Sequence, residues 1–89
     1  MIAGKIFLVE DDVLVATVIR QSLNKFEAFE TTHFTTAEEC LSNMQAQPDI
    51  VIIDYNLPGM DGLELMKKVK NISPGSLVII CSGQEDVKV

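Results

Sequence analysis

Tryptophan is absent from the 89-residue sequence, which also has only two cysteines and one histidine. Cys40 and Cys81 lie far apart, and neither has a Cys or His neighbour at metal-ligand spacing, so the sequence indicates neither a zinc site nor a disulfide framework. We expect both to be buried or partly buried free thiols, because free cysteine behaves as a small hydrophobic residue. A chain of this length can bury roughly 60–70% of its unfolded surface and can fold without such links.

Long apolar runs and clustered basic residues are missing as well. No run approaches the roughly 18 to 20 residues that a membrane-spanning helix needs, and no long apolar segment with a cleavage signal opens the chain. We therefore expect a cytoplasmic protein with no membrane partner. Seven Lys and Arg stand against thirteen Asp and Glu, a formal net charge of −6. Because the seven cations are scattered, we expect no nucleic-acid partner, since phosphate backbones are bound by clustered cations.

A regular alternation of strand and helix patterns is what the sequence does contain. With 47% hydrophobic and 22% charged residues, it fits one domain over residues 1–89. Short unbroken apolar runs predict strands covered on both faces at residues 5–9, 50–54 and 77–81. Apolar residues at steps of three and four predict amphipathic helices at residues 13–26 and 61–71. Their stripes are Val15, Val18, Ile19, Leu23 and Phe26 in the first helix, and Leu65, Met66, Val69 and Ile72 in the second.

Two weaker elements complete the pattern. The stretch 28–32 is expected to be a strand at a sheet edge. A helix at residues 36–46 is indicated by Thr35-Thr36-Ala37-Glu38, where a Thr followed three residues later by Glu can form a capping box, and by Pro48 beyond its end. The alternation predicts an α/β fold with a doubly wound parallel sheet, whose ligand site lies at the carboxyl ends of the strands where the winding reverses.

Acidic residues follow two of the predicted strands. Glu10, Asp11 and Asp12 follow the first strand, and Asp54 ends the strand at 50–54. If these strands are neighbours, the carboxylates converge, and like charges so close call for a divalent cation or partial protonation. Ligands that are all oxygen favour Mg²⁺. We favour a helix-capping role over a metal role for Asp12, and expect Asp61 to cap the helix that follows it.

The ends of these strands carry further residues that fit a phosphoryl-acceptor site. Such a site needs a nucleophilic carboxylate, a cation and positioning groups more than it needs acid–base catalysts. The turn-rich loop after Asp54 contains Pro58-Gly59, and Ser82 supplies a hydroxyl after the strand at 77–81. By contrast, His33 is expected to be a surface residue, because no Cys or His partner lies near it.

The whole chain resembles the receiver domain of bacterial response regulators, on the segments Lys5–Asp12, Asp54–Gly62 and Cys81-Ser82-Gly83. The most specific signal is the Asp-x-x-x-Pro-x-x-Asp-Gly loop that begins at Asp54. The resemblance implies a flavodoxin-like fold, with the strands in the spatial order second, first, third, fourth. It also implies a two-component signalling phosphoprotein that takes a phosphoryl group from a histidine kinase or His-phosphotransfer protein.

The resemblance also implies a role for each site residue. Asp54 would be the phosphoacceptor, Asp11 a direct Mg²⁺ ligand and Glu10 a ligand mainly through bound water. The Asn56 main-chain carbonyl would be the remaining protein ligand. Ser82 would be the hydroxyl that responds to the phosphoryl group. Beyond Asp54 no catalytic residue is implied, and we do not expect an enzyme.

The sequence departs from this family at its C-terminal side. Family members generally continue through a further helix, strand and helix, so the resemblance implies a C-terminally truncated receiver domain. No lysine here matches the one that pairs with the phosphoryl group, and we expect a weaker or shorter-lived adduct. One alternative is a poorly active fragment that self-associates, as a homodimer for example, through the exposed edge of the strand at 77–81. A weaker alternative is a hydrolase that uses Asp54 as its nucleophile, which no second acid supports.

Overall fold

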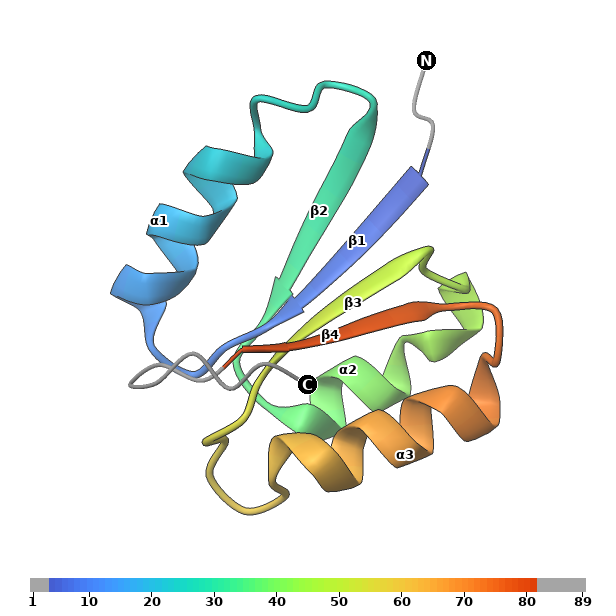
Figure 1. The fold of residues 1–89 in the computed structure, drawn as a ribbon. Helices are drawn as coiled ribbons and strands as arrows, with labels where there is room; N and C mark the ends of the chain where they lie inside the picture. The colour runs from blue at the N-terminus through green and yellow to red at the C-terminus, as the bar shows by residue number, and fades with distance from the viewer. Residues whose placement is uncertain (1–3, 82–89) are drawn as a thin grey trace.

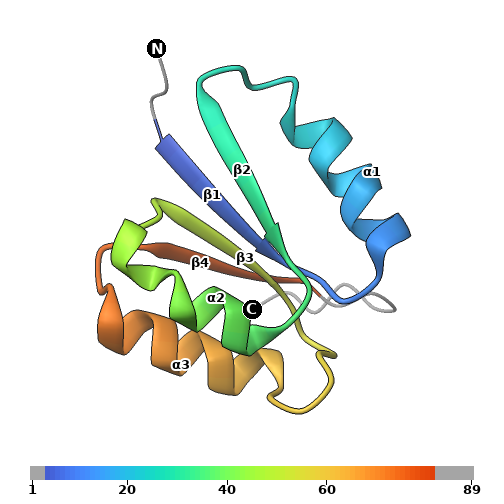
Figure 2. The same cartoon turned by 180° about the vertical axis from the view of Figure 1, so that it is seen from behind.

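The computed structural model describes residues 4–81, which form a four-stranded parallel sheet with helices on both faces (Figures 1 and 2). The strands lie in the order β2-β1-β3-β4, as the resemblance implies. Four strands alternate with three helices and one 3₁₀ turn: β1 (Gly4–Val9), α1 (Val13–Leu23), β2 (Phe29–Phe34), α2 (Ala37–Ser42), η1 (Met44–Ala46), β3 (Ile50–Asp54), α3 (Gly62–Ile72) and β4 (Leu77–Cys81). The doubly wound α/β fold is therefore confirmed, and β2 lies at a sheet edge as expected.

The main core lies between the sheet and the pair α2 and α3. On this face the side chains of one strand stand in register with those of the next, as in Phe7↔Val51↔Val78. The buried residues of this core come from β1, α2, η1, β3, α3 and the loop after β3: Phe7, Val9, Ala37, Cys40, Met44, Val51, Ile53, Leu57, Leu65 and Val69. Met60 and Met66 are partly buried and pack against it. β1 and β3, the two strands whose ends carry the acidic residues, both contribute side chains to this core.

The opposite face is covered unevenly. Figures 1 and 2 show α1 alone on that side, beside β2 and β1. Of the α1 residues only Ala16 is buried, whereas Val15 and Val18 are exposed, so the predicted buried stripe is wrong for those two positions. On β4 the side chains of Leu77 and Ile79 are 57% and 42% exposed. The expectation that the strand at 77–81 is covered on both faces is therefore wrong.

The uncovered surface does not extend over the whole sheet. Ile6 and Leu8 of β1 are buried, as expected for a strand covered on both faces. Ile50 and Ile52 of β3 are half-buried. Among the described residues, exposure therefore rises across the sheet from β1 to β4. The apolar surface that remains is centred on β4.

All three helices begin at side-chain caps. Asp12 accepts hydrogen bonds from the N–H groups of Leu14 (2.9 Å) and Val15 (3.3 Å), and Asp61 accepts one from Glu64 (2.8 Å). Both caps were predicted. The capping pair of α2 is Thr36 with Glu39, one residue beyond the predicted pair, because Thr36 is the last residue with extended backbone before the helix.

Some element ends differ from the predicted ranges. Helix α1 stops at Leu23 rather than at residue 26, because the N–H of Phe26 turns back to the Leu23 carbonyl (2.9 Å) and the Phe26 side chain is exposed. Strand β2 runs two residues further than expected, along the full length of β1. The predicted helix 36–46 breaks at Asn43 into α2 and η1. Cys40 is a buried free thiol as expected, but Cys81 is exposed, which corrects that part of the prediction.

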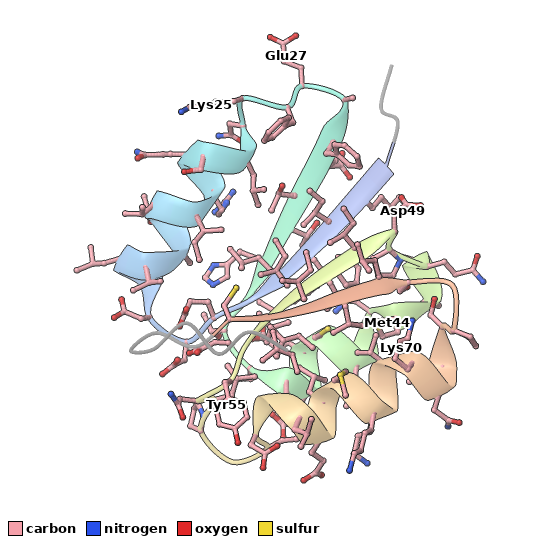
Figure 3. The ribbon with its side chains drawn as sticks, viewed as in Figure 1. Lys25, Glu27, Met44, Asp49, Tyr55 and Lys70 are labelled. Atoms are coloured by element: carbon pink, nitrogen blue, oxygen red, sulfur yellow. The ribbon has the colours of Figure 1, made fainter. Side chains whose placement is uncertain are left out.

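Polar contacts close the end of the sheet that lies away from the acidic residues, where Figure 3 labels Asp49 and Lys70. The Asp49 carboxylate accepts a hydrogen bond from the Lys5 N–H (2.8 Å), and the Lys70 ammonium donates to the Ser76 carbonyl (2.7 Å). The buried Ser76 hydroxyl donates to the Pro48 carbonyl. In the described part of the chain no helix is long and apolar enough to cross a bilayer.

Gly62 lets the start of α3 approach the end of β3. A Cβ at this position would lie 2.7 Å from the Asp54 carbonyl oxygen and 2.8 Å from the Tyr55 Cα. We expect Gly62→Ala to lower the free energy of unfolding by about 1–3 kcal/mol, because backbone has to move to admit the methyl group. Urea unfolding measures this. Gly75→Ala is the control, because a Cβ there meets nothing within 4 Å; an equal loss in both variants would contradict the close-approach explanation.

Candidate functional site

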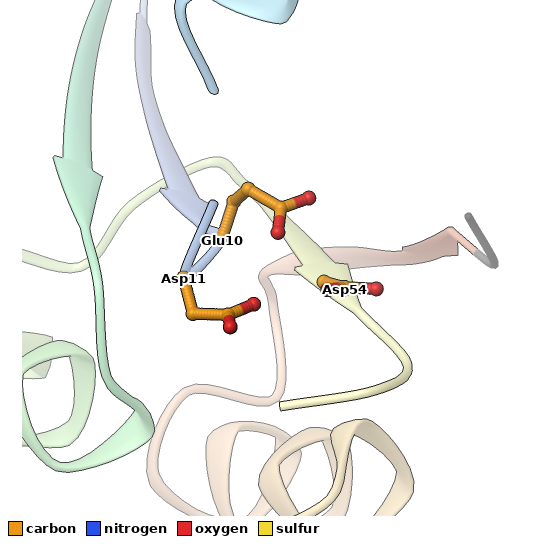
Figure 4. Close-up of side chains that lie close together, drawn as sticks. All are labelled: Glu10, Asp11 and Asp54. Carbon is orange, nitrogen blue, oxygen red and sulfur yellow. The ribbon is translucent and has the colours of Figure 1, made fainter. Parts of the chain in front are cut away.

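Three carboxylates meet at the carboxyl ends of β1 and β3. The two strands pair in parallel with Val9 opposite Ile53, so Glu10 and Asp54 leave the sheet side by side. Glu10, Asp11 and Asp54 each place one oxygen so that all three atoms lie within 4.8 Å of one another (Figure 4). The strand order reverses between β1 and β3, which is where a doubly wound sheet binds its ligand. Asp12 caps α1 and is not a member of this acidic cluster of Glu10, Asp11 and Asp54.

Glu10 is the buried member of the acidic cluster, with 7% of its surface exposed. The pKa of its carboxyl is raised from 4.5 to about 7, mainly by burial; the neighbouring Asp54 and Asp11 contribute to the rise, and a hydrogen bond from the Asp12 N–H opposes it. That N–H lies 3.2 Å from Glu10 Oε2. Three close carboxylates thus make ionisation of Glu10 costly in the absence of a counter-charge.

Local hydrogen bonds hold the loop after β3. The Asn56 N–H donates to Asp54 Oδ1 (3.2 Å), which fixes the carboxylate against its own loop. The Tyr55 N–H donates to the Cys81 carbonyl (2.8 Å), and the Gly62 N–H donates to the Tyr55 carbonyl (3.0 Å). These hydrogen bonds connect the loop to the end of β4 and to the start of α3. Asn56 itself is exposed, two residues after Asp54.

His33 belongs to the surroundings of the acidic cluster, which the sequence did not reveal. Its Nε2 lies 2.7 Å from the Glu10 main-chain oxygen, and the side chain is half-buried. The expectation of a surface residue is therefore wrong. The sequence signal was weak, because the contact spans 23 positions and depends on β2 extending to Phe34.

Cys81 stands beside the acidic cluster on β4, where its Cα pairs with that of Asp54. Although the residue as a whole is exposed, desolvation of its sulfur raises the pKa of the thiol, and the negative charges of Asp54 and Glu10 add to the rise. The thiol is consequently a poor nucleophile at neutral pH. Ser82, the predicted hydroxyl, lies outside the described residues.

The acidic cluster suits a small hard cation. Mg²⁺ prefers oxygen ligands at 2.0–2.1 Å in octahedral geometry, which places ligand oxygens up to about 4.2 Å apart. The three oxygens, all within 4.8 Å of one another, need only small side-chain movements to reach that spacing. Zinc and copper normally take nitrogen or sulfur ligands, and the cluster offers carboxylates alone.

Comparison with known proteins decides the family. The sequence model of the response regulator receiver domain matches residues 6–89. The chain belongs to this family. Receiver domains are the phosphorelay modules of two-component signalling.

Curated relatives show how much of a longer protein the receiver domain represents. The chain is 32% identical over 84 residues to sporulation initiation phosphotransferase F of Bacillus subtilis, covering 93% of this chain and 67% of that protein. It is 34% identical over 86 residues to the C4-dicarboxylate transport transcriptional regulatory protein DctD of Rhizobium meliloti, covering 96% of this chain and 18% of that protein. The chain therefore spans under a quarter of DctD and about two thirds of the phosphotransferase.

Solved structures share the receiver fold. The apo receiver domain of nitrogen regulatory protein C is 32% identical, with a TM-score of 0.83 over 98% of this chain and 70% of that one. The BeF3-activated DrrB receiver domain is 26% identical, with a TM-score of 0.83 over 98% of this chain and 71% of that one. The flavodoxin-like receiver fold is thus confirmed.

The raised pKa of Glu10 predicts a pH dependence of stability in the metal-free protein. Between about pH 4.5 and 7 the folded chain holds a proton at Glu10 that the unfolded chain has released, so stability falls as the pH rises through this window. We expect the free energy of unfolding of the parent protein to fall by about 1–3 kcal/mol between pH 5 and 8, and we expect Glu10→Gln to remove this fall. Urea unfolding in EDTA measures both proteins; parallel pH profiles would contradict the expectation.

Proposed function

We propose that this receiver domain accepts a phosphoryl group on Asp54 in a reaction that depends on Mg²⁺. The observation that carries the proposal is the convergence of Glu10, Asp11 and Asp54 at the ends of β1 and β3. Asp54 is half-buried, its Oδ1 accepts a hydrogen bond from the Asn56 N–H, and one of its carboxylate oxygens lies within 4.8 Å of an oxygen of each of the other two residues (Figure 4). Family membership supplies the reaction class, and the acidic cluster supplies the place for it.

The donor we propose is the phosphohistidine of a sensor histidine kinase or of a His-phosphotransfer protein. An Asp54 carboxylate oxygen attacks phosphorus, the new P–O bond forms, and the P–N bond breaks with its electron pair leaving on the imidazole, which takes up a proton. Bound Mg²⁺ would supply positive charge against the carboxylates and the phosphoryl oxygens. Asp11 would bind it directly, Glu10 through water and Asn56 through its carbonyl oxygen. We propose that Ser82 contacts the transferred group.

We expect Asp54→Asn to abolish the beryllofluoride or acetyl phosphate adduct, because the acceptor oxygen is lost while the side-chain shape is kept. Mass spectrometry of peptides locates the phosphoryl group, and calorimetry measures the beryllofluoride complex with and without Mg²⁺. In the same assay Asp11→Ala should lose at least about 90% of the Mg²⁺-dependent signal, since outer and direct metal ligands typically matter by tenfold or more.

Two helix caps provide matched controls for these variants. Asp12→Asn and Asp61→Asn each remove one nearby negative charge and keep a good capping residue. Both should form the adduct as the parent does. An adduct found on Asp12 or Asp61, or Mg²⁺ affinity unchanged in Asp11→Ala, would refute the assignment.

A second candidate function is self-association through β4. In the described part of the chain β4 pairs only with β3, and Leu77 and Ile79 are exposed on the sheet face opposite α2 and α3, next to this free edge. Such an edge can pair with the same edge of a second copy around a two-fold axis. Burying a few hundred Å² of apolar surface at about 25 cal/mol per Å² would supply several kcal/mol before association costs.

We expect the 89-residue chain to self-associate at high micromolar concentration, and Ile79→Lys to weaken this association by about tenfold or more, because a charge at the pairing edge must lose its hydration. Sedimentation equilibrium measures the association constant. Leu63→Lys is the matched control, since Leu63 on α3 is 41% exposed against 42% for Ile79. A cooperatively folded monomer at that concentration would refute the proposal.

A further inference from the structure

Both main-chain polar groups of Glu10 are bound by β2. The Glu10 N–H donates to the Phe34 carbonyl (3.0 Å), which extends the β1–β2 ladder by one residue. The Glu10 carbonyl lies beyond that ladder and is met by the ring of His33, with 2.7 Å from Nε2 to the oxygen. Because a carbonyl oxygen only accepts, this contact requires hydrogen on Nε2.

The end of β2 that carries His33 is itself fixed. His33 pairs with Leu8 and Phe34 pairs with Val9 in the parallel register. The Phe34 ring packs edge-to-face on Phe7 of the core, with ring centroids 4.9 Å apart. His33 therefore projects from a strand end that is anchored by both main-chain bonds and aromatic packing.

We propose that His33 is a positioning residue for the acidic cluster, an inference that rests on the proposed function of Glu10, Asp11 and Asp54. The peptide between Glu10 and Asp11 is planar, so holding the Glu10 carbonyl fixes the direction of the Asp11 N–H and the place of the Asp11 Cα. The His33 bond thereby fixes where the Asp11 carboxylate stands relative to Asp54. His33 is not itself a member of the acidic cluster.

A purely structural role would make a different prediction. If His33 only satisfied a main-chain acceptor, its loss would lower stability and leave the cation affinity of the folded protein unchanged. If His33 is a positioning residue, the affinity for the cation depends on a hydrogen-bond donor at the position of its Nε2 atom. Gln sets its amide nitrogen at nearly that reach, Asn falls short of it, and Leu has no donor.

The test compares the full chain with His33→Gln, His33→Asn and His33→Leu. Calorimetry measures the Kd for Mg²⁺, urea unfolding measures stability, and an NMR spectrum follows the Asp11 amide. We expect Leu to weaken Mg²⁺ binding by about tenfold, Asn by less and Gln by under about threefold, as for other residues that orient metal ligands. The Asp11 amide should shift in the Leu and Asn variants and stay in place in the Gln variant.

Thr31→Ala is the matched control, because Thr31 is half-buried on the same face of β2, two residues from His33. Equal Mg²⁺ affinity in the parent, Gln and Leu proteins would overturn the inference, as would an equal loss in Thr31→Ala. If His33→Leu does not fold, the difference in Mg²⁺ affinity between His33→Asn and His33→Gln tests the inference instead. If the parent does not bind Mg²⁺, the proposed function fails, and the Asp11 amide alone supports or overturns the positioning role.

Discussion

The parallel pairing of β1 with β3 places like charges side by side, and the rest of the site is arranged around that repulsion. Glu10 directly follows β1 and Asp54 is the last residue of β3, so the register that pairs Val9 with Ile53 also brings Glu10 to Asp54. Main-chain N–H groups of Asp12 and Asn56 hold the carboxylates in place. Burial then makes full ionisation costly, as the high pKa of Glu10 shows. The folded chain stores an unfavourable interaction that a cation can relieve.

The core supports this arrangement from one side. Fully buried side chains of α2, η1 and α3, such as Cys40, Met44 and Leu65, form one cluster with Val9 and Ile53, the residues that directly precede Glu10 and Asp54. On the other face α1 contributes only Ala16 to the buried interior. The positions of the carboxylates are therefore determined mainly by the α2–α3 face, where close packing tolerates little movement. On the α1 face fewer side chains are closely packed.

The sequence predicted the local patterns well and the contacts between distant segments poorly. Strands 50–54 and 77–81 were predicted to the residue, since unbroken β-branched runs have clear ends, and Asp12 and Asp61 were predicted as caps. The convergence of Glu10, Asp11 and Asp54 followed from strand order alone. Exposure of Val15 and Val18 was not predictable, because helical periodicity shows which face is apolar and not whether anything covers it. Exposure of Cys81 was missed because an apolar strand pattern likewise does not show which strand lies at the edge of the sheet. The contact of His33 with Glu10 depends on two extra residues of β2, within the usual error at a strand end.

The two cysteines differ in a way that can be used to observe the site. Cys40 is wholly buried, and burial raises the pKa of its thiol to about 11, so reagents that need thiolate reach it only after unfolding. Cys81 is exposed and pairs across the sheet with Asp54. Mildly alkaline alkylation of the native protein should thus attach a single spin label or fluorophore at Cys81. The unmutated chain carries its own attachment point for a reporter one strand away from the acidic cluster.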